Sequence, residues 1–114
     1  MVKEHILSAP GPTYTNLADL IVIEGIGPFL KPDECSKWLD PLIRTATSGS
    51  ASTPMKTRAK DTIVNTTYVT NIECDDRIEK RLITWVNFYE ERGKTASVEI
   101  VREIQQDVAA GIPF

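Results

Sequence analysis

The sequence has few of the side chains that metal sites and nucleophilic catalysis require. Its 114 residues include one histidine, His5, and two cysteines, Cys35 and Cys74. One histidine excludes a metal site with two or three histidine ligands from this chain alone, and no Cys-x-x-Cys spacing indicates structural zinc. The Gly-x-Ser-x-Gly nucleophile motif and the phosphate-binding loop Gly-x-x-x-x-Gly-Lys-Ser/Thr are also absent. We therefore expect no metal, no cofactor and no catalysis by this chain on its own.

The sequence also lacks a surplus of positive charge and a long apolar run. Lys and Arg number 13 against 16 Asp and Glu, which gives a net charge of −3. A protein that binds nucleic acid through its phosphates normally carries a basic surplus. The longest aliphatic run, 20–23, is far shorter than the roughly 18 residues that span a bilayer. We predict neither a nucleic-acid nor a membrane partner and, because no signal-peptide pattern is visible, a location in the cytoplasm or within an intracellular or viral assembly.

The composition is that of a folded domain, because 41% of the residues are apolar and 25% are charged. Pro10, Gly11 and Pro12 indicate an irregular N-terminal arm over 1–18, and the length leaves room for one domain over 19–114. In the absence of a secretion signal, both cysteines are predicted to be reduced and buried.

Two helices are indicated by apolar residues at helical spacing. The first spans about 32–46: Pro32 suits a first helical turn, and an apolar stripe runs from Cys35 to Ile43. Pro41 should kink this helix or split it. The second spans about 75–92, with its core face formed by Ile78, Leu82, Trp85, Val86 and Tyr89.

The remaining segments predict a short sheet and a loop. The stretches 20–23 and 61–70 are rich in β-branched residues and predict strands, while the Ser, Thr and Gly residues of 45–57 predict a loop. The segment 98–110 is open between helix and strand: Val101, Ile104 and Val108 favour a helix, whereas Val98 and Ile100 could begin a strand. The expected fold is α+β, with the two main helices packed on the short sheet.

Several stretches follow one another in an order found in a known family. They are Ile-Val-Ile-Glu at 21–24, Phe-Leu-Lys-Pro-Asp-Glu-Cys at 29–35, Thr57-Arg58, and the arginine-bearing segment 76–82. This order resembles the N-terminal part of the prolyl 4-hydroxylase-like iron(II)/2-oxoglutarate oxygenases. The resemblance implies that 98–106 is a strand that pairs with 20–23 and 62–69.

The sequence departs from that family at the metal site. The family holds iron with a His-x-Asp motif and a later histidine, and neither occurs in this sequence. The resemblance therefore implies a non-catalytic protein-binding domain, either a truncated relative or one piece of a larger oxygenase. Sheet edges left exposed in such a piece would require a protein partner or self-association.

Two other functions remain open at this stage. The first is a small structural subunit of a multi-protein assembly, such as a virion connector or a large complex, unrelated to the oxygenases. The second, a small carboxylate enzyme, is disfavoured, because the adjacent Asp75 and Asp76 would point about 100° apart on a helix. For a protein-binding function, the candidate partner-binding residues are Trp38, Arg58, Trp85 and Phe114.

Overall fold

The structure, a computed structural model, describes residues 25, 29–70 and 72–110. A short 3-10 turn is followed by four α-helices: η2 (Pro32–Glu34), α3 (Cys35–Thr47), α4 (Thr53–Val69), α5 (Ile72–Glu91) and α6 (Thr95–Ala110). No residue in these ranges forms a strand. The predicted α+β fold is therefore wrong, since the described part of the chain is all-α. The predicted arm at 1–18 and strand at 20–23 lie outside the described residues.

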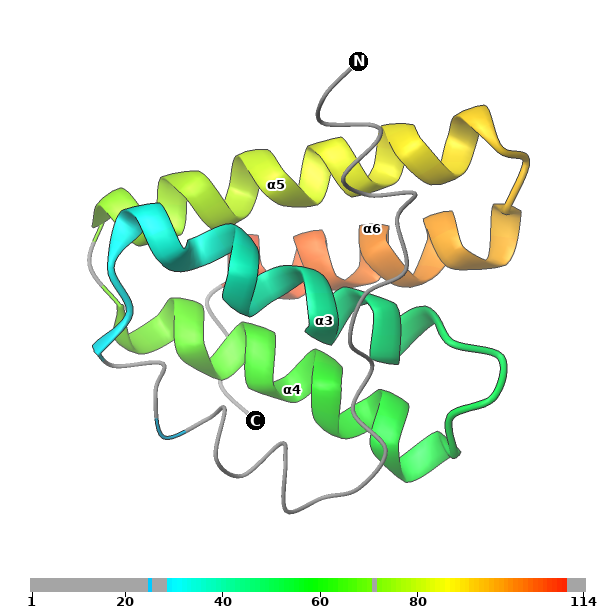
Figure 1. The fold of residues 1–114 in the computed structure, drawn as a ribbon, viewed down its shortest axis with the longest axis horizontal. Helices are drawn as coiled ribbons and strands as arrows, with labels where there is room; N and C mark the ends of the chain where they lie inside the picture. The colour runs from blue at the N-terminus through cyan, green and yellow to red at the C-terminus, as the bar shows by residue number, and fades with distance from the viewer. Residues whose placement is uncertain (1–24, 26–28, 71, 111–114) are drawn as a thin grey trace.

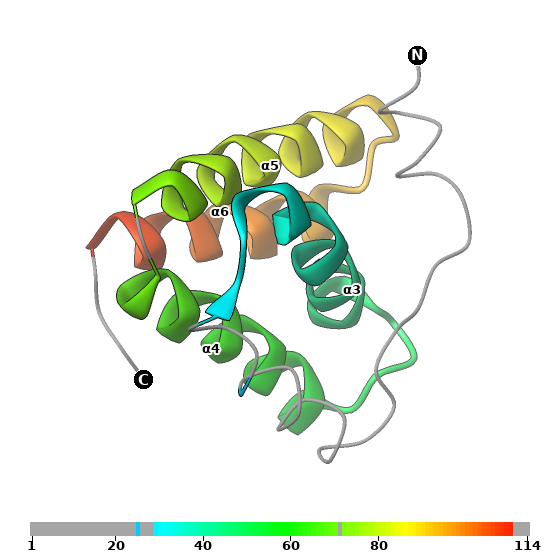
Figure 2. The ribbon, with the colours of Figure 1, turned by 60° about the vertical axis from the view of Figure 1, so that its left-hand side comes forward.

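The four helices form one bundle and alternate in direction (Figure 1). The antiparallel neighbours α3 and α4 pack together, as do α5 and α6, and α3 also contacts α5 and α6. Figure 2 shows α3 between α5 above it and α4 below it. As a result, α4 ends, α5 begins and α6 ends at the same end of the bundle, which we call the junction end.

Helix α4 replaces both the strand predicted at 61–70 and part of the loop predicted at 45–57. The Ser52 side chain caps its start by accepting a hydrogen bond from the backbone N–H of Met55 at 3.4 Å. Met55, Ala59 and Ile63 recur every four residues and are buried, which is helical rather than strand spacing. The many threonines of this segment fit a helix because their hydroxyls bond to its own backbone, as Thr62 does to the carbonyl of Arg58 at 2.8 Å.

Helices form at both predicted helical positions. The turn at Pro32 leads into α3, which runs through Pro41 as one helix and is not split there. Helix α5 begins three residues before the predicted start at Asp75, and Gly93, with φ +67°, follows its end. The segment 98–110 is helical as part of α6, so the strand that the oxygenase resemblance implied at 98–106 is not present.

The core is a single cluster of buried apolar residues from all four helices. Trp85 is 1% exposed and packs against the rings of Phe88 and Tyr89, with centroids 5.6 and 5.4 Å away. Trp85 and Tyr89 occupy the core, as predicted, and Phe88 is buried beside them. None of the helices in the described ranges is long and apolar enough to cross a membrane.

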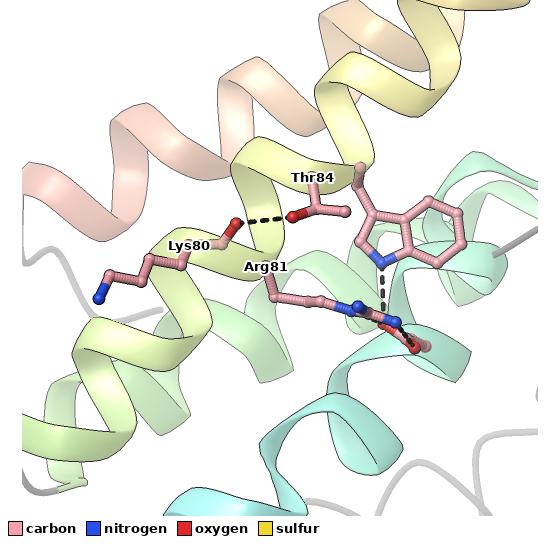
Figure 3. A network of polar contacts seen from close by, with 5 residues as sticks. Lys80, Arg81 and Thr84 are labelled. Atoms are coloured by element: carbon pink, nitrogen blue, oxygen red, sulfur yellow. Dashed lines mark hydrogen bonds and ion pairs between the residues drawn. The ribbon is translucent and has the colours of Figure 1, made fainter. Parts of the chain in front are cut away.

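A polar network ties α3 to α5 inside this core. The Arg81 guanidinium donates from Nε and from a terminal nitrogen to the two carboxylate oxygens of Asp40, at 2.9 and 2.6 Å. The Trp85 indole donates to the same carboxylate at 2.9 Å. Figure 3 shows Arg81 extended toward this carboxylate, whereas Lys80 points away from it. This bidentate arrangement fixes α5 against α3.

Candidate partner-binding cleft

The structure places three of the four predicted partner-binding residues. Trp38 and Trp85 are 5% and 1% exposed, so neither ring presents a surface to a partner on the folded chain. Arg58 lies half-buried on α4 rather than on a strand. Phe114 lies outside the described residues. The described part of the chain does not bring these side chains together at one exposed site.

The described residues do not fit an iron site of the oxygenase kind. No group of three or more His, Cys, Asp or Glu side chains in the described ranges could hold a metal ion. The single histidine, His5, is not among these residues. The described residues also include two buried thiols, Cys35 and Cys74.

The two thiols lie together near the start of α5. Cys74 donates to the carbonyl of Leu30 at 3.2 Å, and Cys35 donates to the neighbouring carbonyl of Lys31 at 3.6 Å. Burial, together with a hydrogen bond and repulsion from Cys74, raises the pKa of the Cys35 thiol from 9.0 to about 12. Both side chains are almost fully buried, at 2% and 0% exposed. A thiol in this environment is a poor nucleophile, because only the thiolate reacts.

A cleft of about 360 Å³ opens between three helices toward the junction end. Its α5 wall consists of Asp75, Glu79, Leu82 and Ile83. The facing wall belongs to α6, and Thr67 of α4 lines the cleft as well. The α6 residues in this wall are Gln105, Val108 and Ala109. We refer to this site as the interhelical cleft.

The interhelical cleft combines an apolar floor with a negatively charged wall. Leu82 is buried beneath it, while Ile83 is 48% exposed at its edge. Asp75 is half-buried and accepts a hydrogen bond from the Thr70 hydroxyl at 2.6 Å, and Glu79 is exposed. The cleft lining in the described structure contains no lysine or arginine. The site can therefore bury an apolar side chain beside two carboxylates.

Further apolar surface lies at the junction end. Ile72, the first residue of α5, is 84% exposed, and Tyr68, near the end of α4, is 61% exposed. Phe29 is 82% exposed and directly precedes Leu30, whose carbonyl contacts Cys74 of α5. Exposed aromatic and aliphatic side chains at one end of a small domain are typical of a surface that binds another protein.

A second groove, on the other flank of α5, is polar, and most of its cationic side chains are paired within the chain. It is lined by residues of η2, α3 and α5, among them Arg77, Lys80 and Arg81. Arg81 is bound to Asp40, and Lys80 pairs with Asp76 at 3.0 Å. Two of the three cationic side chains in this groove are thus paired with acidic residues of the chain. The groove therefore has less unpaired charge to bind a ligand than the interhelical cleft has.

Sequence reasoning missed the interhelical cleft, although one signal was present. Ile72 and Ile83 do not belong to the apolar stripe that forms the core face of α5. An isoleucine off the core stripe is exposed unless another element covers it. The α6 wall was not predictable, because the segment 98–110 was left open between helix and strand.

No family model, curated protein or solved structure matches this chain.

Proposed function

We propose that this chain is a non-catalytic, protein-binding helical domain that docks a partner in the interhelical cleft. The observation that carries this proposal is the exposure of two isoleucines of α5. Ile83 lines the cleft, and Ile72 lies at the start of the same helix, on the same side by helical spacing. Burying each exposed isoleucine would contribute roughly 1–2 kcal/mol, given about 25 cal/mol per Å² of apolar surface removed from water. The described residues give no catalytic constellation to set against this function.

Of the two protein-binding roles, we favour a small structural subunit of a larger protein assembly. The alternative, a piece of a 2-oxoglutarate oxygenase, required a strand at 98–106, where the chain forms α6. A subunit unrelated to the oxygenases carries no such requirement. The proposal includes a location within an intracellular or viral assembly, where a partner would cover the exposed side chains at the junction end.

Site-specific crosslinking in the cells that make this chain tests the function. A photoreactive amino acid at position 83 should yield a discrete crosslinked protein, whereas the same probe at the exposed Glu99 position should not. Adding Ile72→Asp should remove the crosslink, because a carboxylate would replace the apolar contact. The same yield at both positions would contradict the proposal, and so would a crosslink that Ile72→Asp leaves unchanged.

A further inference from the structure

The carboxylates of the interhelical cleft indicate what kind of partner it takes. We infer that the occupant is a cationic amphipathic helix of another protein, with two basic residues one turn apart and apolar residues on either side of them. This inference rests on the proposed protein-binding function and deepens it. The two can fail separately, because the peptide assay tests the kind of partner and the crosslink tests protein binding itself.

The first observation is a four-residue stripe on the flank of α5 that faces the cleft. Ile72, Asp75, Glu79 and Ile83 follow one another at spacings of three, four and four residues, which places them on one side of the helix. At 1.5 Å per residue, the two carboxylates are about 6 Å apart along the helix axis, and the two isoleucines are about 16 Å apart. This order, apolar–acidic–acidic–apolar, spans about three helical turns.

The second observation is that these two carboxylates have no cationic partner among the described residues. Four other acidic side chains are paired with cations: Glu103 with Lys60, Glu90 with Arg102, Asp76 with Lys80, and Asp40 with Arg81. Glu73, Glu99 and Asp107 form no ion pair within the described structure, but they do not line the cleft. The Asp75 carboxylate accepts a hydrogen bond from the Thr70 hydroxyl. Within the described structure, neither Asp75 nor Glu79 forms an ion pair. Asp75 and Glu79 thus place two uncompensated negative charges beside the apolar floor of the cleft.

This combination matches a helix that carries the opposite charges. Amphipathic helices bind in grooves through side chains that recur every three or four residues on one face, and charge complementarity sets their register. Lysine or arginine residues spaced like Asp75 and Glu79 would meet both carboxylates. Apolar residues beyond them would contact Ile72 and Ile83.

The same charges disfavour other occupants. In a symmetric dimer built on this surface, the carboxylates of one copy would approach those of the other, which is repulsive. Nucleic acids and anionic lipid surfaces would meet the same repulsion from Asp75 and Glu79. A positively charged protein segment is the macromolecular partner that both the charge and the apolar surface favour.

A synthetic helical peptide tests the inference on the full chain. Its leucines and lysines follow the spacing of Ile72, Asp75, Glu79 and Ile83 on a background of alanine and glutamine. One control peptide carries glutamate in place of lysine, and another has the same composition with the lysines moved to the opposite face. Binding is measured by fluorescence anisotropy at several salt concentrations, and the site is located from NMR shifts of the Ile83 and Val108 methyl groups.

Two charge reversals supply matched protein variants. Glu79→Lys and Glu99→Lys each change an exposed glutamate on a helix surface, but only the first lies in the cleft. Glu79→Lys should weaken binding of the lysine peptide about tenfold, because it removes one exposed ion pair and adds a repulsion of similar size. It should strengthen binding of the glutamate peptide, and Glu99→Lys should change neither affinity.

Three outcomes overturn the inference. The lysine and glutamate peptides bind equally, or Glu99→Lys weakens binding as much as Glu79→Lys does, or no peptide binds. If no peptide binds while a probe at position 83 still crosslinks to a protein, the partner chemistry is wrong and the protein-binding function stands. If the crosslink is also absent, both proposals fail.

Discussion

Asp40 is a buried carboxylate that, within the described residues, accepts its hydrogen bonds from α5. Its exposed fraction is 6%, and it is bound by Arg81 and Trp85. Removing its charge leaves the Arg81 guanidinium, with 11% of its side chain exposed, without a counter-ion. Breaking a buried pair in this way costs about 3–5 kcal/mol, whereas an exposed pair contributes about 0–1 kcal/mol.

We therefore expect Asp40→Asn to lower the free energy of unfolding by about 3 kcal/mol, measured by urea denaturation. Asp76→Asn is the matched control, because it breaks the exposed pair with Lys80 on the same helix and should cost under about 1 kcal/mol. The double variant Asp40→Asn/Arg81→Met should lose less than the sum of its single variants, since no unpaired charge remains. Equal losses from the two Asp→Asn changes would show that the buried pair has no special role.

The Cys35 thiol makes stability depend on pH in the alkaline range. Its pKa rises from 9.0 in the unfolded chain to about 12 in the folded chain, so its contribution to stability is complete below pH 9. Above that pH the unfolded chain releases the proton first, and the free energy of unfolding falls by up to about 1.4 kcal/mol per pH unit. Burial also raises the pKa of Tyr89 above 10.0, which has the same sign.

We expect Cys35→Ala to show a shallower loss of stability than the unchanged chain between about pH 9 and about pH 11. Thermal melts at matched ionic strength measure this difference, and the Tyr89 contribution cancels because both proteins contain it. Parallel pH profiles for the two proteins would contradict a raised thiol pKa.

At the scale of the helices, the sequence predicts the position of a helix best where its apolar stripe is unbroken. Helices α3 and α5 occupy their predicted positions because Cys35, Leu39 and Ile78 belong to clear apolar stripes. Acidic residues precede α3 in the turn η2 and occupy the first turn of α5. Helix α4 was mistaken for a strand because threonine and valine have strand propensity. Their side chains can still pack in a bundle, and the Thr62 hydroxyl donates a hydrogen bond to the backbone of its own helix. Tertiary packing thus overrides a weak local preference.

Helix α5 ends close to a glycine whose backbone conformation favours helix termination. Gly93 has φ +67°, and an added methyl group there would meet no atom within 4 Å. Gly49, in the loop between α3 and α4, has equally open surroundings but no positive φ. The two glycines therefore differ in backbone conformation and not in available space.

We expect Gly93→Ala to destabilise the bundle by about 1 kcal/mol, because an L-residue is strained in the left-handed region. Gly49→Ala should be neutral or stabilising by up to about 0.5 kcal/mol, since alanine has less freedom in the unfolded chain. Urea midpoints of the two variants make the comparison. If both substitutions cost the same, the backbone conformation at Gly93 is not what distinguishes these positions.

At the scale of the whole molecule, the sequence predicted much of the core but not the candidate site. Trp85 and Tyr89 were correctly assigned to the core, because large apolar residues on a helical stripe are usually buried. The interhelical cleft arises from α5 meeting α6 and the end of α4. A surface shared by three elements depends on how they pack, which a stripe on one helix does not specify.

Two residues of α5 that lie close in the sequence differ in their relation to the core. Trp85 is enclosed by the core, whereas Ile83 is half-exposed at the edge of the cleft. Trp85→Ala should cost about 3–5 kcal/mol, while Ile83→Ala should cost under about 1 kcal/mol and weaken partner binding instead. Urea denaturation measures the first effect, and the peptide assay measures the second.

Trp85→Ala also leaves Trp38 as the only tryptophan, so its fluorescence then reports on α3 alone while far-UV circular dichroism reports on all helices. Because residues of all four helices share one core cluster, the two signals should change at the same urea concentration. Separate midpoints would mean that α3 leaves the bundle before the other helices do. In that case the Arg81–Asp40 pair, which this variant retains, would not be sufficient to couple α3 to α5.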